Sequence, residues 1–441
     1  MKKLASFVFV AGLGVLSART IHRYQSRPVS SAVSLSERQT LRDALNSDYS
    51  DLNGDVKQTL SNLKEQSSGM AALPGAVVIP PGADAAAAAK AQNASSAIAK
   101  CATPKGFFAG SDYKQYWTRD VGYSVEVLIK HGYADTVAVH LEDLLKHQQP
   151  TGAIPTEIHT LRGLIQGLEP HIWMRNFEYR GLRFLKDRKD LSSDFHGSEA
   201  DSFLIFLVTA KTYESMTGKD TFSTTYKDQI AKLIKYVESL KDPSGLIPGS
   251  AWFDAMINYH GKFTLNNQVW LYKMYKAYGM QEQARMTQGL LESFWDAQRG
   301  YYVDYKGGDH FDTLSNAMLL NEGVVPPDRA KSVLDNLAKS FTKFGYVNLY
   351  PTYDPGLCSE RVHEYQNSTI WPFIELRVAQ AFARYGQPEK AAQIKALMEA
   401  RQGVNEWYSS VDGHPDGSKN QLWTASAYLG VSDLVGGSAA N

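Results

Sequence analysis

Two carboxylic acids far apart in the chain have the residue type and the surroundings that acid-base chemistry needs. Asp254 stands in the segment "SAWFDAMIN" and Glu406 in the segment "GVNEWYSS", each among aromatic residues. A carboxyl group in apolar surroundings tends to keep its proton, as a general acid must at neutral pH. Asp254 could instead cap a turn in water, and Glu406 could end a helix. The apolar neighbours favour Asp254 as a general acid, with Glu406 as the second carboxylate.

A third segment, "QYWTRDVGY" at 115–123, brings Trp117, Arg119 and Asp120 together where a helical apolar pattern begins. An acidic residue is favoured near the positive end of a helix, so Asp120 has a structural explanation, and both charges could simply face solvent. The alternative is that these residues form the wall of a binding site. Both interpretations stay open for this window alone.

Aromatic residues gather on the same kind of segment. Seven of the eight tryptophans, all but Trp295, lie on or beside irregular stretches between helical patterns. Such side chains stack on sugar rings, and neighbouring polar groups can bind hydroxyls. Two carboxylic acids on separate segments beside these surfaces are the minimum equipment for breaking a glycosidic bond. The further candidates for substrate binding are Trp252, Tyr365, Gln366, Trp371 and Trp423.

The elements that must position these residues are predicted to be helices. Apolar residues recur at helical spacing, and few stretches have the alternation of a strand. The predicted helices cover 117–131, 133–148, 199–217, 222–241, 266–278, 281–296, 311–321, 326–344, 366–385, 388–402 and 421–435.

These helices come in close pairs, and a longer aromatic-rich segment follows each pair. Helices that begin near 117, 199, 266, 311, 366 and 421 come directly after the long segments. Two concentric rings, an inner and an outer ring of six helices, would fit this order. An ordinary solenoid is the alternative, but no fixed repeat period is visible. We therefore predict an all-α fold, an (α/α)6 barrel, whose long loops gather at one end and carry the function.

The first hundred residues have a different character. Residues 1–18 resemble a signal peptide or an uncleaved membrane anchor, because lysines precede a short apolar run. Residues 19–66 are predicted to form a helical extension, which could supply the sixth outer helix. Residues 67–100, rich in Ala, Gly, Pro and Ser, are predicted to be a linker before a catalytic domain at 101–441. Export from the cytoplasm follows as an expectation.

Composition excludes several partners. The 46 basic residues balance the 46 acidic ones, so no electrostatic signature for nucleic acid or an anionic membrane surface is present. Cys101 and Cys358 allow at most one disulfide, and the 11 histidines show no ligand spacing. We expect a carbohydrate as the partner, no nucleic acid, no membrane contact beyond the possible anchor, and no metal or organic cofactor.

Four motifs resemble known carbohydrate-active families. "YWTRD" resembles a Trp-x-Arg-Asp segment of glucoamylases and amylo-α-1,6-glucosidases. "SAWFDA" followed by "TLNNQVWLYKMY" resembles the debranching-glucosidase pattern that contains the general acid. "NEWYSS" followed by "GSKNQLWTASAYL" resembles the segment of processing α-glucosidases and glucoamylases that contains the general base. "YQNSTIWPF" is similar to an element of several families with an (α/α)6 barrel.

The resemblance implies roles for individual residues. Asp254 would be the acid and Glu406 the base, and Arg119 with Asp120 would hold the hydroxyls of the terminal sugar. Asp201 and Asn267 match polar positions near the substrate. An aspartate as the acid, where glucoamylases use glutamate, points toward the debranching and processing glucosidases.

The expected reaction is the release of a terminal sugar, α-linked glucose by the resemblance, from an oligosaccharide or small glucoside. Asp254 would protonate the leaving oxygen while Glu406 activates water on the opposite face, with the carboxyls about 6.5–9.5 Å apart and inversion at the anomeric carbon. Three alternatives stay open. A phosphorylase would need cations beside Glu406, where Lys419 is the candidate. A lyase would use His260, His363 or Tyr365 as its base. A binding protein on the same barrel would lack activity.

Overall fold

The computed structural model describes residues 85–159, 200–359 and 364–438 of the 441-residue chain. All of them belong to one compact unit, Gly75–Asn441. The predicted signal peptide or anchor at 1–18, the extension at 19–66 and the linker residues 67–84 lie outside the described residues. Within the described ranges, no helix has both the length and the apolar character needed to cross a membrane.

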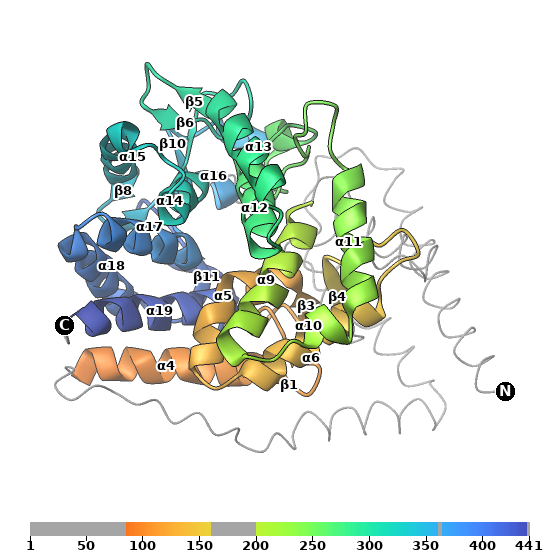
Figure 1. The fold of residues 1–441 in the computed structure, drawn as a ribbon. Helices are drawn as coiled ribbons and strands as arrows, with labels where there is room; N and C mark the ends of the chain where they lie inside the picture. Colours follow the sequence, from red (N-terminus) through yellow and green to blue (C-terminus); the bar gives the residue numbers. More distant parts are fainter. Residues whose placement is uncertain (1–84, 160–199, 360–363, 439–441) are drawn as a thin grey trace, which may run out of the picture. The chain divides into compact units, whose positions relative to one another are not determined.

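A closed ring of helices forms the centre of this unit (Figure 1). Each inner helix packs against the next one in the chain, and the last packs against the first. The predicted (α/α)6 barrel is therefore confirmed. The inner helices are α5 (Thr118–Lys130), α9 (Asp201–Thr217), α12 (Leu265–Ala277), α14 (Thr313–Glu322), α17 (Pro372–Arg384) and α19 (Leu422–Ser438).

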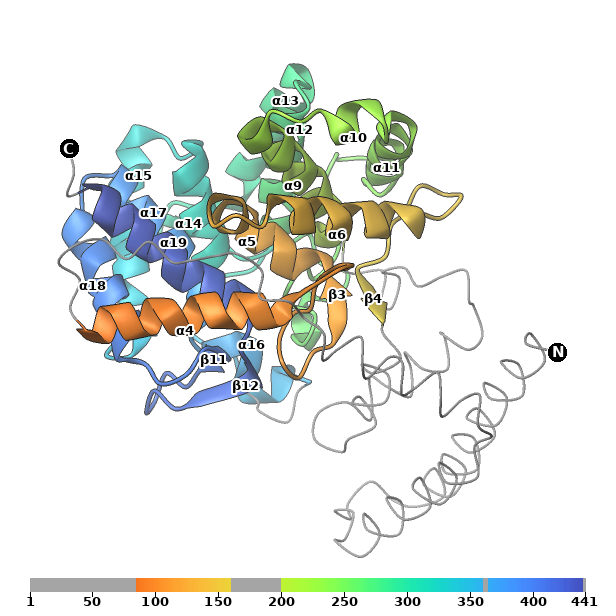
Figure 2. The same ribbon diagram turned by 90° about the horizontal axis from the view of Figure 1, so that it is seen from below.

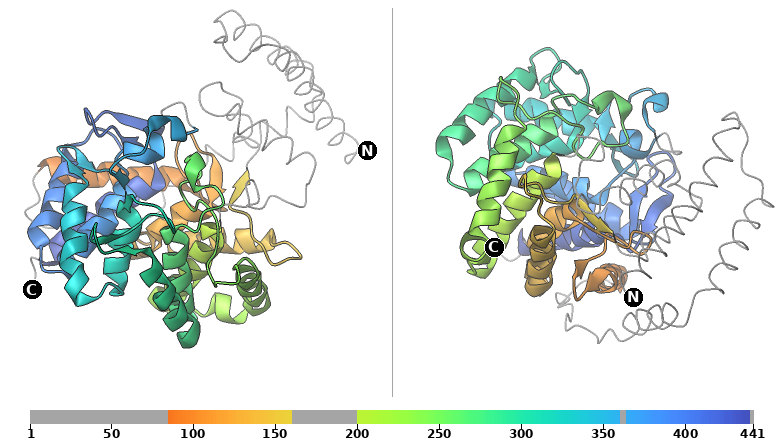
Figure 3. Two further views of the ribbon diagram at one scale, coloured as in Figure 1. Left: turned by 90° about the horizontal axis from the view of Figure 1, so that it is seen from above. Right: turned by 90° about the vertical axis from the view of Figure 1, so that its right-hand side faces the viewer.

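A second layer of helices surrounds the ring, as the views from below and above show (Figures 2 and 3). In α15, Ala330, Val333, Leu334 and Leu337 are buried, and this i, i+3, i+4, i+7 spacing forms one apolar stripe against the ring. Inner helices are buried on nearly every side. The outer helices are α4 (Ala85–Cys101), α6 (Ala134–Lys146), α10 (Thr221–Thr224) with α11 (Lys227–Ser239), α13 (Gln281–Leu291), α15 (Pro327–Lys339) and α18 (Pro388–Ala400).

Helix α4 corrects the prediction of a linker over 67–100, because the chain is helical from Ala85 onward. It lies alongside α19 (Figures 1 and 2) and completes the outer layer, a place for which the extension at 19–66 was the candidate. Alanine has the highest helix propensity, and its small side chain lets two helices approach closely. Lys90 of α4 donates hydrogen bonds of 2.7 Å to the backbone oxygens of Arg401 and Gly403, beyond the end of α18. The composition typical of a linker here belongs to a packed helix.

Short antiparallel strand pairs occupy the connections between helices. Strand β3 leads into α5 and pairs with β4, which follows α6, with Trp117 opposite Glu157. The pair β11–β12 precedes α19, with Trp407 opposite Asp416. The paired strands are β1 (Ala102–Thr103) with β2 (Gly106–Phe107), β3 (Gln115–Trp117) with β4 (Glu157–His159), β5 (Trp295–Asp296) with β6 (Tyr301–Tyr302), β7 (Phe311–Asp312) with β10 (Leu349–Tyr350), β8 (Phe341–Thr342) with β9 (Gly345–Tyr346), and β11 (Asn405–Tyr408) with β12 (Pro415–Lys419).

Helix α17 begins later than the predicted helix 366–385. A single turn, α16 (Tyr365–Ser368), comes first, and α17 then begins at Pro372, with Trp371 as its N-cap. Proline at the first position of a helix loses no hydrogen bond, because that N–H has no partner inside the helix. Trp371 and Pro372 therefore start the helix and do not lie inside it, as the predicted range 366–385 implied. The two cysteines are buried and free, so they form no disulfide with each other.

Candidate active site

Polar side chains at the N-terminal ends of the inner helices meet at one end of the ring. Arg119 of α5 contacts Asp201 of α9, and Asp120 of α5 accepts a hydrogen bond of 2.9 Å from Gln421, directly before α19. All four side chains are buried. These contacts join the first inner helix, α5, to the second, α9, and to the residue before the last, α19. The segments that the sequence singled out are therefore brought together.

Asp254 lies between Arg119 and Gln366. Gln366 Nε2 donates a hydrogen bond of 2.8 Å to Asp254 Oδ1, and Arg119 Nη1 lies 3.5 Å from Asp254 Oδ2. The Asp254 side chain is 23% exposed. Its setting is therefore more polar and more open than its neighbours in sequence suggest, because Trp252 and Phe253 turn into the core and leave the carboxyl at its edge.

Gln366 also holds the backbone around Asp254. Its side-chain nitrogen donates to the carbonyl oxygen of Trp252 at 2.5 Å, and its side-chain oxygen accepts from the N–H of Ala255 at 2.8 Å. One amide thus binds the residue two before Asp254, the residue after it and its carboxyl group. The predicted substrate residue Gln366 is buried, and its contacts fix the acid segment in place.

Arg119 and Asp201 form a buried pair behind Asp254. Arg119 Nε and Nη2 donate to the two oxygens of Asp201 at 2.7 and 2.9 Å, in the bidentate geometry that makes such pairs strong. Arg119 Nη2 also donates to the carbonyl oxygen of Ala251 at 2.8 Å. Asp201, predicted to lie near the substrate, is 0% exposed and contacts Arg119 from behind, so a role through Arg119 fits its position better than direct contact.

Glu406 lies in β11 and is 3% exposed. Tyr365 donates its hydroxyl to Glu406 Oε1 at 2.7 Å, and the backbone N–H of Ser418 donates to Oε2 at 3.0 Å. Tyr113 gives a further side-chain hydrogen bond. Burial raises the pKa of Glu406 to about 7, although these donors act in the opposite direction. Ser418 and Tyr113 were not predicted from the sequence.

Asp120 is the neighbouring acid. Burial raises its pKa well above the ordinary range, and the negative charge of Glu406 acts in the same direction. Arg119 and the hydrogen bond from Gln421 partly oppose this rise. Two carboxyl groups close together in a buried place do not both ionise easily. Gln421 was missed at the sequence level, although it lies inside the quoted motif "GSKNQLWTASAYL".

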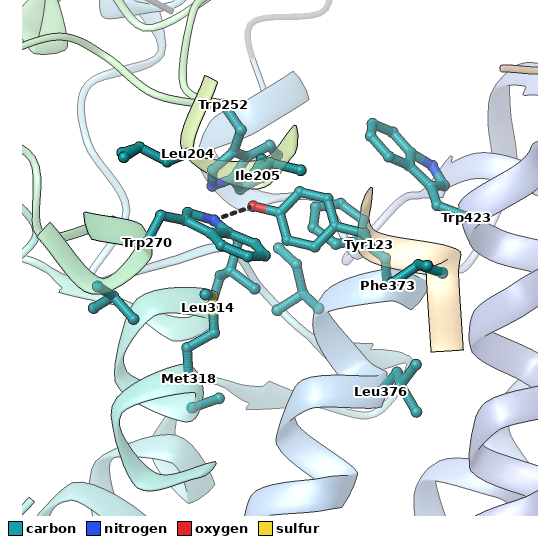
Figure 4. Packing of buried hydrophobic residues seen from close by; sticks show 14 of the residues in the cluster. Tyr123, Leu204, Ile205, Trp252, Trp270, Leu314, Met318, Phe373, Leu376 and Trp423 are labelled. Carbon is teal, nitrogen blue, oxygen red and sulfur yellow. Dashed lines mark hydrogen bonds between the residues drawn. The ribbon is translucent and has the colours of Figure 1, made fainter. Parts of the chain in front are cut away.

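An aromatic cluster supports the site from the core. Trp371 contacts Trp252 and Trp423 edge to face, with ring centroids 5.4 and 5.5 Å apart, and Trp423 stacks on Phe373 at 4.7 Å. Figure 4 shows Trp252, Phe373 and Trp423 in this packing, with Tyr123 between Trp270 and Phe373. Trp252 and Trp371 are nearly inaccessible, so they act as supports for the site, not as open stacking surfaces.

The remaining predicted residues have mixed positions. Asn267 is fully buried, and its side-chain nitrogen donates to the carbonyl oxygen of Gly249 at 3.1 Å. It therefore anchors the stretch of backbone that leads from Gly249 to Asp254. Trp117 ends β3 and is partly exposed, which keeps it available as a contact for a ligand. Across the described ranges, no group of three or more His, Cys, Asp or Glu side chains is arranged to hold a metal ion.

The fold and the site together define an (α/α)6 barrel with two carboxyl groups held at one end of its ring. Comparison with known proteins finds a match of residues 276–424 to the mannosylglycerate hydrolase MGH1-like glycoside hydrolase domain. The matched range includes Glu406, Tyr365 and Gln366, and it begins after Asp254 and Arg119.

Two curated relatives share part of their sequence with this chain. The mannosylglycerate hydrolase of Thermus thermophilus is 29% identical over 147 residues, which are 32% of this chain and 35% of that protein. The glucosylglycerate hydrolase of Mycolicibacterium hassiacum is 30% identical over 138 residues, which are 27% of this chain and 30% of that protein. The chain thus covers about a third of the length of the curated relatives it matches.

Solved structures share the fold. The GH63 mannosylglycerate hydrolase from Thermus thermophilus, in complex with Tris and D-glycerate, superposes with a TM-score of 0.58 at 14% identity, over 78% of this chain and all of that one. A rhamnosidase from Klebsiella oxytoca with bound rhamnose has a TM-score of 0.56 at 16% identity, over 82% of this chain and 66% of that one. Likeness at this identity concerns the fold alone.

Proposed function

We propose that this protein is a glycoside hydrolase that releases a terminal sugar with inversion at the anomeric carbon. The observation that carries the proposal is the pair Tyr365 and Gln366. These consecutive residues bind the two candidate carboxyl groups, Tyr365 that of Glu406 and Gln366 that of Asp254. Both acids therefore lie at the same end of the ring. Separate carboxyl groups beside one binding place are what an inverting hydrolysis requires.

Glu406 is proposed as the general base. A base works best when its pKa is near the operating pH, and burial brings the pKa of Glu406 to about 7. The donors Tyr365 and Ser418 stabilise its ionised form, which is the form that takes a proton from water. Asp254, which is more open to solvent, is proposed as the acid that protonates the leaving oxygen.

The substrate proposed from the motif resemblance is an α-linked glucoside, with Asp120, Arg119 and Trp117 near the terminal sugar. The names of the curated relatives add a second candidate, a glucosyl or mannosyl glycoside of glycerate. Trp252 and Trp423 have buried indole N–H groups without a hydrogen-bond partner among the described residues, and an ordered water would satisfy them.

The alternatives receive less support. Lys419, the cation that a phosphorylase would need, is exposed, and its backbone N–H binds Asp112. Tyr365, a candidate base for a lyase, donates its hydroxyl to Glu406. His260 contacts the backbone oxygen of Asp254, and His363 lies outside the described residues. A non-catalytic binding protein remains the alternative that an activity test decides.

The test is to incubate the purified full-length chain with maltose, isomaltose, trehalose, glucosylglycerate and mannosylglycerate. Released sugar and its anomeric form are followed by proton NMR. We expect one of these substrates to give the inverted anomer, and Asp254→Asn and Glu406→Gln to lower the rate by about 10²–10⁴-fold each. Release of the retained anomer would refute the mechanism. Hydrolysis of no glycoside in a wider panel would refute the function.

A further inference from the structure

Arg119 faces two acids at once. Two of its nitrogens bind Asp201 at 2.7 and 2.9 Å, and the third, Nη1, lies 3.5 Å from Asp254 Oδ2. The side chain of Arg119 is 6% exposed, so water does little to screen its charge. A buried cation needs a carboxylate beside it. Without the charge of Asp201, Asp254 would be the carboxylate left for Arg119 to pair with.

Arg119 also fixes the backbone that leads to Asp254. It donates to the carbonyl oxygen of Ala251, three residues before the acid. Ala251 has a φ of 52°, a left-handed conformation that is unfavourable for an L-residue with a side chain. The hydrogen bond holds this turn in its strained form, and Gln366 holds the other side of the segment through Trp252 and Ala255. Arg119 and Gln366 thus hold the backbone around Asp254 and so fix the position of its carboxyl group.

We propose that Asp201 is a positioning residue for the acid, because it locks Arg119 in place and balances its charge so that Asp254 can carry the proton for the leaving group. This rests on the proposed function for the role of that proton, whereas the locking of Arg119 rests on the contacts alone. Asp201 touches neither substrate nor reacting atoms. It acts through Arg119.

The charged surroundings of Asp254 give the direction of the effect. Arg119 approaches from α5 with Asp201 of α9 behind it, and Asp120 follows Arg119 in α5. From its own loop, His260 binds the backbone oxygen of Asp254. From α16, the uncharged Gln366 donates to its carboxyl. Removal of the charge of Asp201 leaves Asp254 as the carboxylate that Arg119 contacts, so Arg119 is drawn toward the acid and away from its present position.

The experiment compares wild type with Asp201→Asn on two substrates of the same sugar. One substrate is the natural-type glycoside, whose leaving group needs a proton, and the other is the glycosyl fluoride, which needs little help from an acid. We expect Asp201→Asn to impair the glycoside far more than the fluoride, because only the glycoside depends on a correctly placed acid. At neutral pH the glycoside should lose about 10- to 100-fold in rate and the fluoride less than about threefold.

Two further variants keep the test decisive. Asp312→Asn is the matched control, because Asp312 is equally buried at the start of α14 and contacts its N-cap partner Ser315. It should leave the rates on both substrates unchanged. The double variant Arg119→Gln/Asp201→Asn lacks the buried pair of charges, so it should fold even if the single variant does not, and it should show the same selective loss on the glycoside.

The outcomes separate the two proposals. Equal loss on both substrates, in the single or the double variant, would overturn the role of Asp201 while the hydrolase stands. If wild type hydrolyses no glycoside, the proposed function fails, and crystal structures of wild type and Asp201→Asn still test the positioning. A displaced Arg119 and a relaxed Ala251 turn would support it, and an unchanged arrangement would overturn it.

Discussion

Tyr365 and Gln366 are neighbours in α16, yet each donates a hydrogen bond to a different carboxyl group. The hydroxyl of Tyr365 binds Glu406 Oε1 at 2.7 Å, and the amide of Gln366 binds Asp254 Oδ1 at 2.8 Å. One short turn thus fixes the position of one acid relative to the other. Any movement of α16 would change both at once, which makes this turn the place where the geometry of the pair is set.

The first prediction concerns Tyr365→Phe. Loss of a donor to the ionised form raises the pKa of Glu406 above about 7, so a smaller fraction of the base is ionised at neutral pH. The acid limb of kcat/KM should move to higher pH by about one unit, with a rate roughly tenfold lower at pH 6. Tyr385→Phe, at the far end of α17, serves as the control. An acid limb unchanged in Tyr365→Phe would contradict the assignment of Glu406 as base.

The second prediction concerns Gln366→Met, which has nearly the same size and no amide. Its loss removes a donor from Asp254 and leaves the N–H of Ala255 without its acceptor. The rate should fall while the acid limb stays at its wild-type position, whereas Tyr365→Phe moves the acid limb, and stability should fall by about 1–3 kcal/mol. Rate profiles and urea unfolding would measure both. If the acid limb moved instead, the roles of the two carboxyls would be exchanged.

The third prediction uses Gly417, which has a φ of 70° in the β11–β12 pair. A Cβ atom here would clash with Glu406 Oε2 and would lie 2.7 Å from Glu406 Cβ. Gly417→Ala should therefore displace the carboxylate and lower kcat by about 10²-fold. Gly386→Ala has a similar φ of 74° and open space around its Cβ, so it reports the backbone strain alone. Equal kcat in the two variants would show that activity does not depend on the position of the Glu406 carboxylate.

The fourth prediction concerns stability and pH. The pKa of Glu406 is raised from the ordinary 4.5 to about 7 in the folded chain. The folded state therefore holds a proton that the unfolded state releases, and stability is lost as pH rises from about 4.5 through 7. Glu406→Gln removes this dependence. The variant should be more stable than wild type by up to about 3 kcal/mol at about pH 8 and nearly equal at about pH 4.5.

Urea unfolding at the two pH values measures this difference. Glu389→Gln, on the exposed first turn of α18, serves as the control and should show no gain at either pH. A gain for Glu406→Gln that is the same at both pH values would mean that repacking, and not the buried charge, is responsible.

The fifth prediction concerns α4. Lys90→Met keeps the apolar stem and removes the donors to Arg401 and Gly403, whose carbonyl oxygens then lack these partners. Stability should fall by about 1–3 kcal/mol. Lys130→Met, at the exposed end of α5, should change it by less than about 0.5 kcal/mol. If both variants unfold at the same urea concentration, α4 contributes nothing through this contact.

Much of the fold was predictable because helical periodicity is a local property. Apolar spacing placed α5, α9, α12 and α14 and their partners within a few residues, since each inner helix buries most of its surface and each outer helix one stripe. Helix α4 was missed because a run of alanine and serine has the composition of a linker. Only the contact with α19, far away in sequence, shows that these small side chains pack closely.

The site was predictable as a set of segments but not as a network. Residue types and motifs selected Asp254, Glu406, Arg119 and Gln366. They did not reveal that Asp201 lies behind Arg119, because a bidentate contact between two helices leaves no local pattern. The burial of Glu406 and the openness of Asp254 were likewise decided by tertiary packing, which turned Trp252 and Phe253 inward.

The packing of α4 against α19 has a consequence for how the chain reaches its native state. The hydroxyl of Tyr428 binds the backbone oxygen of Ala87 across 341 positions of sequence. When the ribosome makes α4, the partner helix does not yet exist, so the earlier hairpins must form while one side of the ring stays open. Contacts between such distant positions form slowly, since a long loop must close first. We expect ring closure to be the last and slowest step of folding, and the open ring to be the species that chaperones recognise.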